Sequence, residues 1–434
     1  MRSLVIAAAL LALAQPAMAE RRILVRSPGQ FDKAVARIAP GDTIVLADGV
    51  WRDARLDFHG AGRAGKPITL TAQTPGRVVL SGQSNLRMSG AFLVVSNLVF
   101  RDGYSPTDEV VSFRRAPGDH AVDSRVTGVV IDRYNKPERE TLDHWVALYG
   151  ERNRFDHGHL VGKTNIGPTL VVIREPVDGL RNDHRIDHNF FGPRPNVRAN
   201  GGETIRVGTS HYAHTASHTT VDSNWFEHCD GENEIVSNKS GENTFRGNVF
   251  FESQGALTLR HGDNALVEGN AFLGNGKPHT GGIRVINRGQ TVRNNYLENL
   301  EGEATVSALS IMYGVPNSPP TRYVQVEGAV IEHNTIINAR SIAIGLGMDQ
   351  ERTLAPINSR LDSNLIVNLD GSDPVRIKGD ASGVALTNNV RDPKTVLRRR
   401  ANGQLAAVGA GGVGAGDMVV VQRAATGVSW YPKD

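Results

Sequence analysis

The sequence has a single cysteine, Cys229, among its 434 residues. A chain with one cysteine cannot be held together by an intramolecular disulfide, so the fold must rest on its own core. We expect Cys229 to be a small buried apolar side chain rather than a reactive thiol.

Long hydrophobic runs are also scarce. The run from Leu4 to Ala14 is shorter than the roughly 20 apolar residues that a spanning helix needs, and no later stretch approaches that length. It follows Arg2 and precedes Ala17-Met18-Ala19, a small-x-small cleavage pattern. We therefore predict a cleaved signal peptide over residues 1–19, a mature chain that is periplasmic or secreted, and no membrane partner.

An excess of charge of one sign is absent. The 48 Lys and Arg residues nearly balance the 45 Asp and Glu residues, which leaves a formal net charge of +3. This balance does not indicate nucleic acid or another polyanion through bulk electrostatics, so a local basic cluster would matter more. Both a monomer and a homodimer are compatible with the sequence.

Long helical patterns are almost absent too. From about residue 65, short runs rich in Val, Ile, Leu and Thr alternate with Gly, Asn and Asp turns, which predicts an all-β chain. The exception is the stretch from Ser27 to Ile38, whose apolar residues at 31, 34, 35 and 38 predict a one-faced helix that ends at Pro40-Gly41-Asp42. Such a helix would cap the open end of a repeat fold.

The sequence is rich in one recurring turn, an asparagine followed by hydrophobic residues. It occurs at Asn189, Asn224, Asn248, Asn270, Asn295, Asn334, Asn364 and Asn389. The spacings are 35, 24, 22, 25, 39, 30 and 25 residues, a period of about 22 to 25 interrupted by insertions. Asparagine tolerates the left-handed conformation, and stacked amides can hydrogen-bond from coil to coil. A leucine-rich repeat is excluded because its leucine framework is missing.

The pattern therefore predicts a single-domain, right-handed parallel β-helix with an N-terminal capping helix. The domain covers residues 20–434, with coils over about 25–390 and a C-terminal cap or tail over 391–434. We expect the Arg398-Arg399-Arg400 run and the Gly-rich stretch 409–416 to be solvated and without chemistry.

Three cations fall at similar places in consecutive coils. Lys239 and Arg260 are 21 residues apart, close to one coil, and Arg284 lies a further coil along. Stacked residues in a parallel β-helix are separated by roughly 4.8 Å, so we expect the three cations in one row on one face. Because like charges repel, such a row indicates an anionic ligand.

Two carboxylates lie just before these cations. Glu232 and Glu234 are two residues apart and project to the same face if the segment is extended. Two carboxylates with a carbonyl-type oxygen suit a hard cation such as calcium, and Asn200, about one coil earlier, could supply that oxygen.

At this point the sequence resembles polysaccharide lyase family 6, the alginate lyases and the chondroitinase B-like dermatan sulfate lyases. The resemblance rests on four segments and covers about residues 25 to 390; the segments are Asn200–Arg206, Ile205–His211, Glu232–Ser240 and Gly255–Gly262. It implies a calcium-dependent enzyme that cleaves an acidic polysaccharide, with alginate as substrate. Larger members carry a second β-helical domain, for which this chain is too short.

The resemblance also implies residue roles. Asn200, Glu232 and Glu234 would be calcium ligands, Lys239 the base and Arg260 the acid. His261 and Arg284 would bind substrate, and the weaker substrate-binding candidates are Arg206, Lys163 and Tyr212. The chemistry agrees, because β-elimination removes the weakly acidic C5 proton beside the uronate carboxylate, and calcium there offsets negative charge. Arginine rarely loses its proton, so Arg260 could protonate the leaving O4 or only stabilise it.

Other functions remain as alternatives. A dermatan sulfate lyase would need additional basic residues for sulfate, which the sequence does not reveal. A polygalacturonase-type hydrolase needs carboxylate pairs that span a water, and no Asp-Asp pair or Gly-His-Gly is present. Pectate lyases use Asp-rich metal sites and an arginine base. A non-catalytic β-helical carbohydrate-binding protein would share the asparagines but has no need for the Glu, Lys and Arg set.

Overall fold

The computed structural model of the chain describes residues 20–409 and 411–433. The predicted signal peptide, residues 1–19, lies outside these described residues. In the described part of the chain, no helix is long and apolar enough to cross a membrane.

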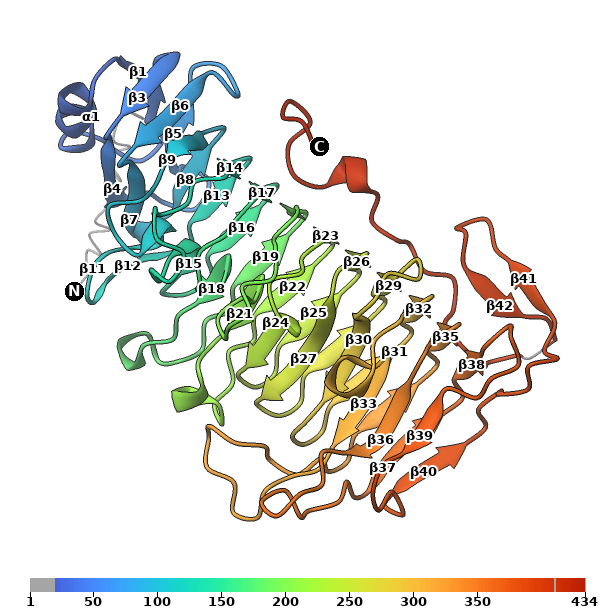
Figure 1. The fold of residues 1–434 in the computed structure, drawn as a ribbon. Helices are drawn as coiled ribbons and strands as arrows, with labels where there is room; N and C mark the ends of the chain where they lie inside the picture. Colours follow the sequence, from blue (N-terminus) through green and yellow to red (C-terminus); the bar gives the residue numbers. More distant parts are fainter. Residues whose placement is uncertain (1–19, 410, 434) are drawn as a thin grey trace, which may run out of the picture.

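Three long sheets run side by side along one solenoid (Figure 1). The first contains, in order, β1 (Arg22–Val25), β2 (Thr43–Leu46), β5 (Ile68–Ala72), β8 (Leu93–Ser96), β13 (Arg125–Thr127), β16 (Arg154–Asp156), β19 (Arg185–Asp187), β22 (Thr220–Asp222), β25 (Thr244–Arg246), β28 (Leu266–Glu268), β31 (Thr291–Arg293), β34 (Val330–Glu332), β37 (Ser359–Asp362) and β40 (Val384–Thr387).

The second sheet begins with the only antiparallel pair in it, β11 (Arg114–Ala116) and β12 (Asp119–Val122). It continues through β7 (Asn85–Ala91), which also pairs with β4 (Arg55–Ala61), to β10 (Glu109–Ser112), β15 (His144–Leu148), β18 (Leu170–Val172), β21 (Ile205–Val207), β24 (Glu234–Lys239), β27 (Gly255–His261), β30 (Thr280–Val285), β33 (Leu309–Met312), β36 (Ile342–Leu346) and β39 (Val375–Ile377).

The third sheet contains β3 (Gly49–Arg52), β6 (Val78–Gly82), β9 (Val99–Gly103), β14 (Val130–Asp132), β17 (His159–Val161), β20 (Phe190–Phe191), β23 (Trp225–Glu227), β26 (Val249–Phe251), β29 (Ala271–Leu273), β32 (Tyr296–Glu298), β35 (Thr335–Ile337) and β38 (Leu365–Val367). Apart from β11 and β12, neighbouring strands of each sheet come from neighbouring coils and pair in parallel, for example β23 with β26. The fold is a parallel β-helix, as the asparagine period predicted.

The predicted capping helix is present as α1 (Pro28–Val35) at the N-terminal end of the solenoid (Figure 1). Ser27 caps it by accepting a hydrogen bond from the backbone N–H of Gln30, and Pro28 occupies the first turn, where no amide donor is needed. Its buried residues are Phe31, Ala34 and Val35, three of the four apolar positions that predicted the helix.

The core is built from stacked identical or similar side chains, one from each coil. Within the third sheet the rings of Phe191, Phe226, Phe250 and Phe272 stack with centroid separations of 4.9, 4.6 and 4.5 Å. Cys229 is 1% exposed in this core, where burial raises the pKa of its thiol to about 12. It is a buried side chain, as the sequence indicated.

The eight recurring asparagines form one unbroken ladder. Each side-chain amide donates to the side-chain oxygen of the next, over distances of 2.9 to 3.0 Å, from Asn189 through to Asn389. Coil-to-coil amide bonding is therefore confirmed. The recurring asparagines do not themselves adopt the left-handed conformation, so that expectation was wrong. The residue before each of them does, such as His188 (φ 55°) or Ser223 (φ 55°).

The last coil strand, β40, is followed by an antiparallel hairpin of β41 (Leu397–Arg399) and β42 (Leu405–Ala407). The chain then turns back along the outer face of the third sheet (Figure 1). The Ala415 N–H donates to Thr335 Oγ1 at 2.8 Å, Arg423 pairs with Glu227, and Tyr431 donates to Asp132 at 2.6 Å. Arg398 and Arg399 are exposed, as expected, but Ala415 in the Gly-rich stretch is buried, and so are Met418 and Val428 beyond it, which pack against the sheet.

Candidate active site

The outer face of the second sheet carries the predicted catalytic residues on β24 and β27. Val236, Leu257 and Ile283 pair across β24, β27 and β30 and point into the core. Because side chains alternate along a strand, the next partners, Ser237, Thr258 and Arg284, point outward. Lys239 and Arg260 lie two residues beyond Ser237 and Thr258 and share this outer face.

The expected single row of three cations is wrong in its register. Arg284 pairs with Thr258 rather than with Arg260, so that coil contains 26 residues, and register shifts occur in both strand pairs. Arg206, which pairs with Ser237 on β21, belongs to the same row as Arg284. Lys239 and Arg260 lie further along their strands than this row, and they are not in register with each other, because a register shift pairs Lys239 with His261.

Two glutamates connect these rows. Glu234 Oε1 accepts a hydrogen bond from Arg284 and lies 4.0 Å from Arg260 Nε, while its other oxygen accepts from Ser237. Glu203, just before β21, places Oε1 3.6 Å from Lys239 Nζ. These cations and carboxylates come from different coils, yet they are in contact on one face.

Glu232 is the most perturbed of the carboxylates. Burial raises its pKa to about 8, and repulsion from Glu203 and Glu234 acts in the same direction. Glu203 Oε2 is itself buried and has no hydrogen-bond partner. Buried carboxylates that repel one another and lack donors provide oxygen atoms where a cation would be stabilised.

A cavity of about 530 Å³ opens beside these groups. Its lining includes the three predicted ligands Asn200, Glu232 and Glu234, together with Arg284, Thr305 and Tyr323. Residues 20–409 and 411–433 hold no preassembled group of three or more His, Cys, Asp or Glu side chains positioned for a metal. Two carboxylates and one amide oxygen on a single cavity wall nevertheless fit a calcium ion, whose remaining ligands come from water or substrate.

The loop that carries Asn200 is fixed by a buried arginine. Arg194 is 3% exposed and donates hydrogen bonds to several backbone carbonyl oxygens. One of these is Glu203 O, and another is Gly167 O, which lies at 2.9 Å. It also donates to Gly201 O at 3.3 Å. Burial lowers the pKa of Arg194 to about 10, although nearby Glu203 and Glu232 oppose that change. The backbone on both sides of Gly202 is thereby tied to one side chain.

The predicted substrate-binding residues differ in their exposure. His261 pairs with Lys239 across the strands and is 2% exposed; burial, with Arg260 and Lys239, lowers its pKa to about 3, so its imidazole is neutral. Arg206 is half-buried and its Nε has no hydrogen-bond partner. Tyr212 lies in a short 3₁₀ turn, η2 (Ser210–Tyr212), whose backbone is held by Arg174.

Lys163 is misplaced as a substrate-binding candidate. Its side chain is 1% exposed, its Nζ lies 3.7 Å from Asp143 Oδ2, and it donates to Asn165 O at 3.3 Å. Burial lowers its pKa and raises that of Asp143. A buried lysine that is bound to an internal carboxylate cannot reach a polymer on the surface.

Sequence reasoning missed Glu203 and Tyr323. Glu203 lies inside the quoted Asn-Gly-Gly-Glu segment, so its proximity to Glu232 could have been inferred had the coil register been known. Tyr323 lies in the long insertion between β33 and β34, and no spacing rule brings that insertion to the site.

A larger cavity, of about 760 Å³, lies between the C-terminal segment and the first sheet. Its cations already have partners, since Arg400 donates to Ala415 O at 2.9 Å and Arg293 donates to Glu268 at 2.6 Å. Of the residues that line it, His333 alone is suited to acid–base chemistry, so no acid–base pair is brought together there.

Known proteins resemble the chain over nearly its whole length. The family model described as Chondroitinase B matches residues 25–422. The PL6 family alginate lyase AlyGC is 49% identical with a TM-score of 0.93; the match covers 95% of this chain and 59% of that one. The chain thus spans 59% of the length of that relative.

Two further solved structures align with the chain. A mannuronic acid specific polysaccharide family 6 lyase from the human gut microbiota is 32% identical, with a TM-score of 0.79 and coverage of 86% of this chain and 92% of that one. The PL6 family lyase Pedsa3628 from Pseudopedobacter saltans, at 24% identity and a TM-score of 0.81, covers 94% of this chain and 100% of its own and supports the fold alone. No curated protein matches the chain.

Proposed function

Because the chain belongs to the chondroitinase B family, polysaccharide lyase family 6, we propose that it is a calcium-dependent lyase that cleaves 4-linked uronate polymers by β-elimination, with alginate as its substrate. AlyGC, described as an alginate lyase, shares 49% of its aligned sequence with this chain, which supports the choice of substrate.

One observation supports the activity most strongly. Lys239 and Arg260 project from adjacent strands onto the same face, and each lies within 4.0 Å of a carboxylate that borders the proposed metal site. β-Elimination beside a carboxylate requires a base, a cationic group for the leaving oxygen and a cation site, all close together.

In the proposed reaction Lys239 acts as the base and takes the C5 proton of the uronate. The electrons of the C5–H bond form the C4=C5 double bond while the C4–O4 bond breaks. Arg260 donates a hydrogen bond to the departing O4, which takes up a proton from water to become a hydroxyl, and the other product carries an unsaturated sugar at its new end.

Asn200, Glu232 and Glu234 would hold the calcium ion, which when bound offsets the charge of the substrate carboxylate and so acidifies C5–H. Glu203 borders the same site and faces Lys239. Arg284 and Arg206 lie in one row along the sheet and are suited to bind neighbouring carboxylates of the polymer.

Alginate is favoured over dermatan sulfate because few cations line the cavity. Its lining contains two arginines, Arg198 and Arg284. A sulfated polymer would require further cations for its sulfate groups.

The test is a panel of alginate, mannuronate-rich and guluronate-rich fractions, dermatan sulfate and pectate, each with calcium and with chelator. We expect calcium-dependent formation of ultraviolet-absorbing unsaturated ends from alginate fractions. Products from dermatan sulfate alone would make the chain a dermatan sulfate lyase, and binding without any product would make it a carbohydrate-binding protein.

We further propose that the protein is exported. The motivation is the apolar stretch before Ala17-Met18-Ala19. N-terminal sequencing of the mature protein should begin at Glu20, and a cytoplasmic protein that still begins at Met1 would contradict export.

A further inference from the structure

The guanidinium of Arg260 is held by a loop far away in the sequence. This loop joins β33 to β34 and contains Thr321, Arg322 and Tyr323. Arg260 donates from one terminal nitrogen to Arg322 O at 3.2 Å and from the other to Thr321 O at 3.4 Å. Its Cζ lies over the Tyr323 ring, 4.2 Å from the centroid, at the distance of a cation–π contact.

The loop is itself anchored to a second loop. Arg352 also lies over the Tyr323 ring, with Cζ 5.3 Å from the centroid, and pairs with Asp349. Beside it, Arg322 Nε donates to Glu351 at 2.7 Å. The ring is therefore held by the segment 349–352 as well as by its own loop, and it stays in place without help from Arg260.

A second anchor competes for the same guanidinium. Glu234 Oε1 is 4.0 Å from Arg260 Nε and already accepts a hydrogen bond from Arg284. If the contact with the loop were lost, Arg260 could close the remaining gap and pair with Glu234. An arginine has five N–H donors, of which the loop takes two, so the others stay available for an oxygen in the site.

Tyr323 also reaches the cavity directly. It lines the same 530 Å³ cavity as Asn200, Glu232 and Glu234. One side chain thus contacts Arg260 and borders the space in which a sugar beside the proposed metal site would lie.

We propose that Tyr323 is a positioning residue for Arg260: its ring, with the carbonyls of Thr321 and Arg322, holds the guanidinium away from Glu234 and directed at the leaving oxygen. The inference rests on the proposed lyase function, because it assigns the residue that makes Arg260 effective there. It attributes to Tyr323 an effect on turnover rather than on polymer affinity.

The first test compares Tyr323→Leu with Tyr323→Phe. The leucine variant removes the ring, and kcat on alginate should fall about 10- to 100-fold while KM changes less than about 3-fold. The phenylalanine variant keeps the ring and should retain kcat within about 3-fold. Tyr431→Leu is the matched control, since it removes a partly buried tyrosine of the C-terminal segment that binds Asp132 on the third sheet, and it should leave kcat within about 2-fold.

The second test asks whether the loss acts at the leaving oxygen. On a uronate that carries an aryl leaving group at C4, departure needs little help, so the deficit of Tyr323→Leu should shrink to under about 3-fold. An equal deficit on both substrates, or a phenylalanine variant as slow as the leucine variant, would overturn the proposal. Wild-type kcat in Tyr323→Leu would overturn it as well.

A third readout does not depend on activity. The N–H signal of Arg260 Nε in an arginine-labelled protein should be shifted by the Tyr323 ring, and this shift should persist in Tyr323→Phe and vanish in Tyr323→Leu. If wild-type protein eliminates no uronate polymer, the lyase proposal fails whatever the signal does. If it is active and the Arg260 signal is the same in all three proteins, the positioning role fails alone.

Discussion

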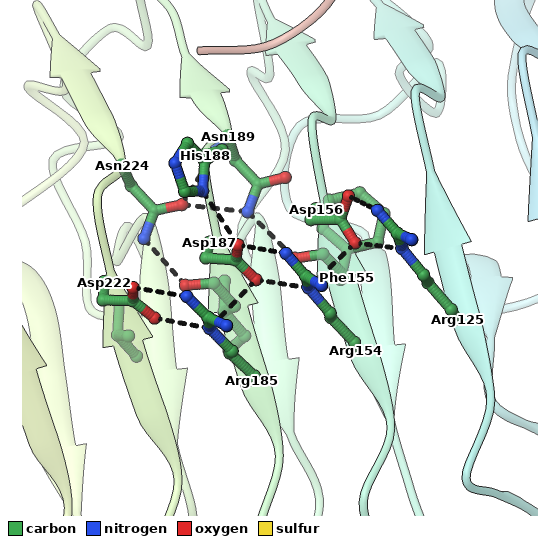
Figure 2. A network of polar contacts seen from close by, with 12 residues as sticks. Arg125, Arg154, Phe155, Asp156, Arg185, Asp187, His188, Asn189, Asp222 and Asn224 are labelled. Carbon is green, nitrogen blue, oxygen red and sulfur yellow. Dashed lines mark hydrogen bonds and ion pairs between the residues drawn. The ribbon is translucent and has the colours of Figure 1, made fainter. Parts of the chain in front are cut away.

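Two faces of the same solenoid differ in how completely their buried carboxylates are paired with cations. On the first sheet, Figure 2 shows a ladder in which each arginine forms two bonds with the aspartate one coil along: Arg125 with Asp156, Arg154 with Asp187, and Arg185 with Asp222. His157 and His188 stack beside it at 5.2 Å and bind Asp156 and Asp187. On the second sheet, the carboxylates of Glu203 and Glu234 lie close to that of Glu232, and Glu203 Oε2 has no hydrogen-bond partner.

The pKa values of the carboxylates on the two sheets shift in opposite directions. Burial opposes ionisation of Asp156, yet hydrogen bonds from His157, Arg125 and Thr127 outweigh it and the pKa falls below its usual range. At Glu232, burial is reinforced by repulsion from other carboxylates, and the pKa rises. We infer that the ladder, where opposite charges alternate, stabilises the coils, while the second sheet keeps a charge imbalance that a cation and an anionic substrate would relieve.

The largest expected effect comes from removing the base. Lys239→Ala should lower kcat on alginate by about 10³-fold, because it removes the group that takes the C5 proton, while the melting temperature stays close to wild type. Lys277→Ala is the matched control: Lys277 binds Asp230 at 2.8 Å outside the site, and its loss should leave activity within about 2-fold. A variant at position 239 that keeps more than a few per cent of turnover would exclude Lys239 as the base.

Next comes Glu232→Gln, which should act on activity and stability in opposite directions. Losing one proposed calcium ligand should lower turnover by about 10²-fold at limiting calcium. Removing a repelled carboxylate should raise the melting temperature of the calcium-free protein by about 1–3 °C at pH 8. Calorimetry and rate assays measure both; a lower melting temperature without calcium would mean that Glu232 is not repelled.

Breaking the arginine–aspartate ladder of the first sheet should lower the stability of the fold without lowering activity. Arg154→Met leaves the fully buried Asp187 with fewer donors and should destabilise the fold by about 1–3 kcal/mol, measured by denaturant unfolding, with activity unchanged. Arg52→Met, at a surface pair with Asp53 in which both side chains are exposed, by 75% and 58%, should cost under about 0.5 kcal/mol. If Arg154→Met lowered activity in proportion to Lys239→Ala, the division between the two faces would not hold.

The smallest effect is the pH dependence of stability in the calcium-free protein. The lowered pKa of Asp156 gives stability that is present above about pH 4 and lost as the pH falls. The raised pKa of Glu232 gives stability that is present below about pH 4.3 and lost as the pH rises through about 8. Asp156→Asn should flatten the acid side of the melting curve and Glu232→Gln the alkaline side; if neither variant changes its side, the pKa directions are wrong.

Much of the fold could be predicted because one residue type recurs at one kind of turn. Each asparagine from Asn189 to Asn389 marks one coil, and the side chains of all of them are linked by the same coil-to-coil hydrogen bond. The return of the C-terminal segment over the third sheet could not be read, because its contacts, such as Arg423 with Glu227, join residues 196 positions apart without any repeat.

The site could be predicted only to within a coil. Counting back from the asparagines placed Lys239, Arg260 and Arg284 in one row, but bulges in β27 and its neighbours move Arg284 to the row of Arg206. The prediction for Lys163 failed for a different reason: it lies just after β17, and the sequence does not show whether a side chain in such a turn points inside or outside the coil. Tyr323 lies in an insertion, where periodicity gives no information.

The most direct test of the difference between the two faces is a crystal structure of the Lys239→Ala variant with calcium and an alginate oligosaccharide. We predict that calcium lies among Asn200, Glu232 and Glu234, that a uronate C5–H faces position 239, and that its O4 faces Arg260. An oligosaccharide bound along the Arg125, Arg154 and Arg185 ladder, or calcium bound away from the second sheet, would contradict it.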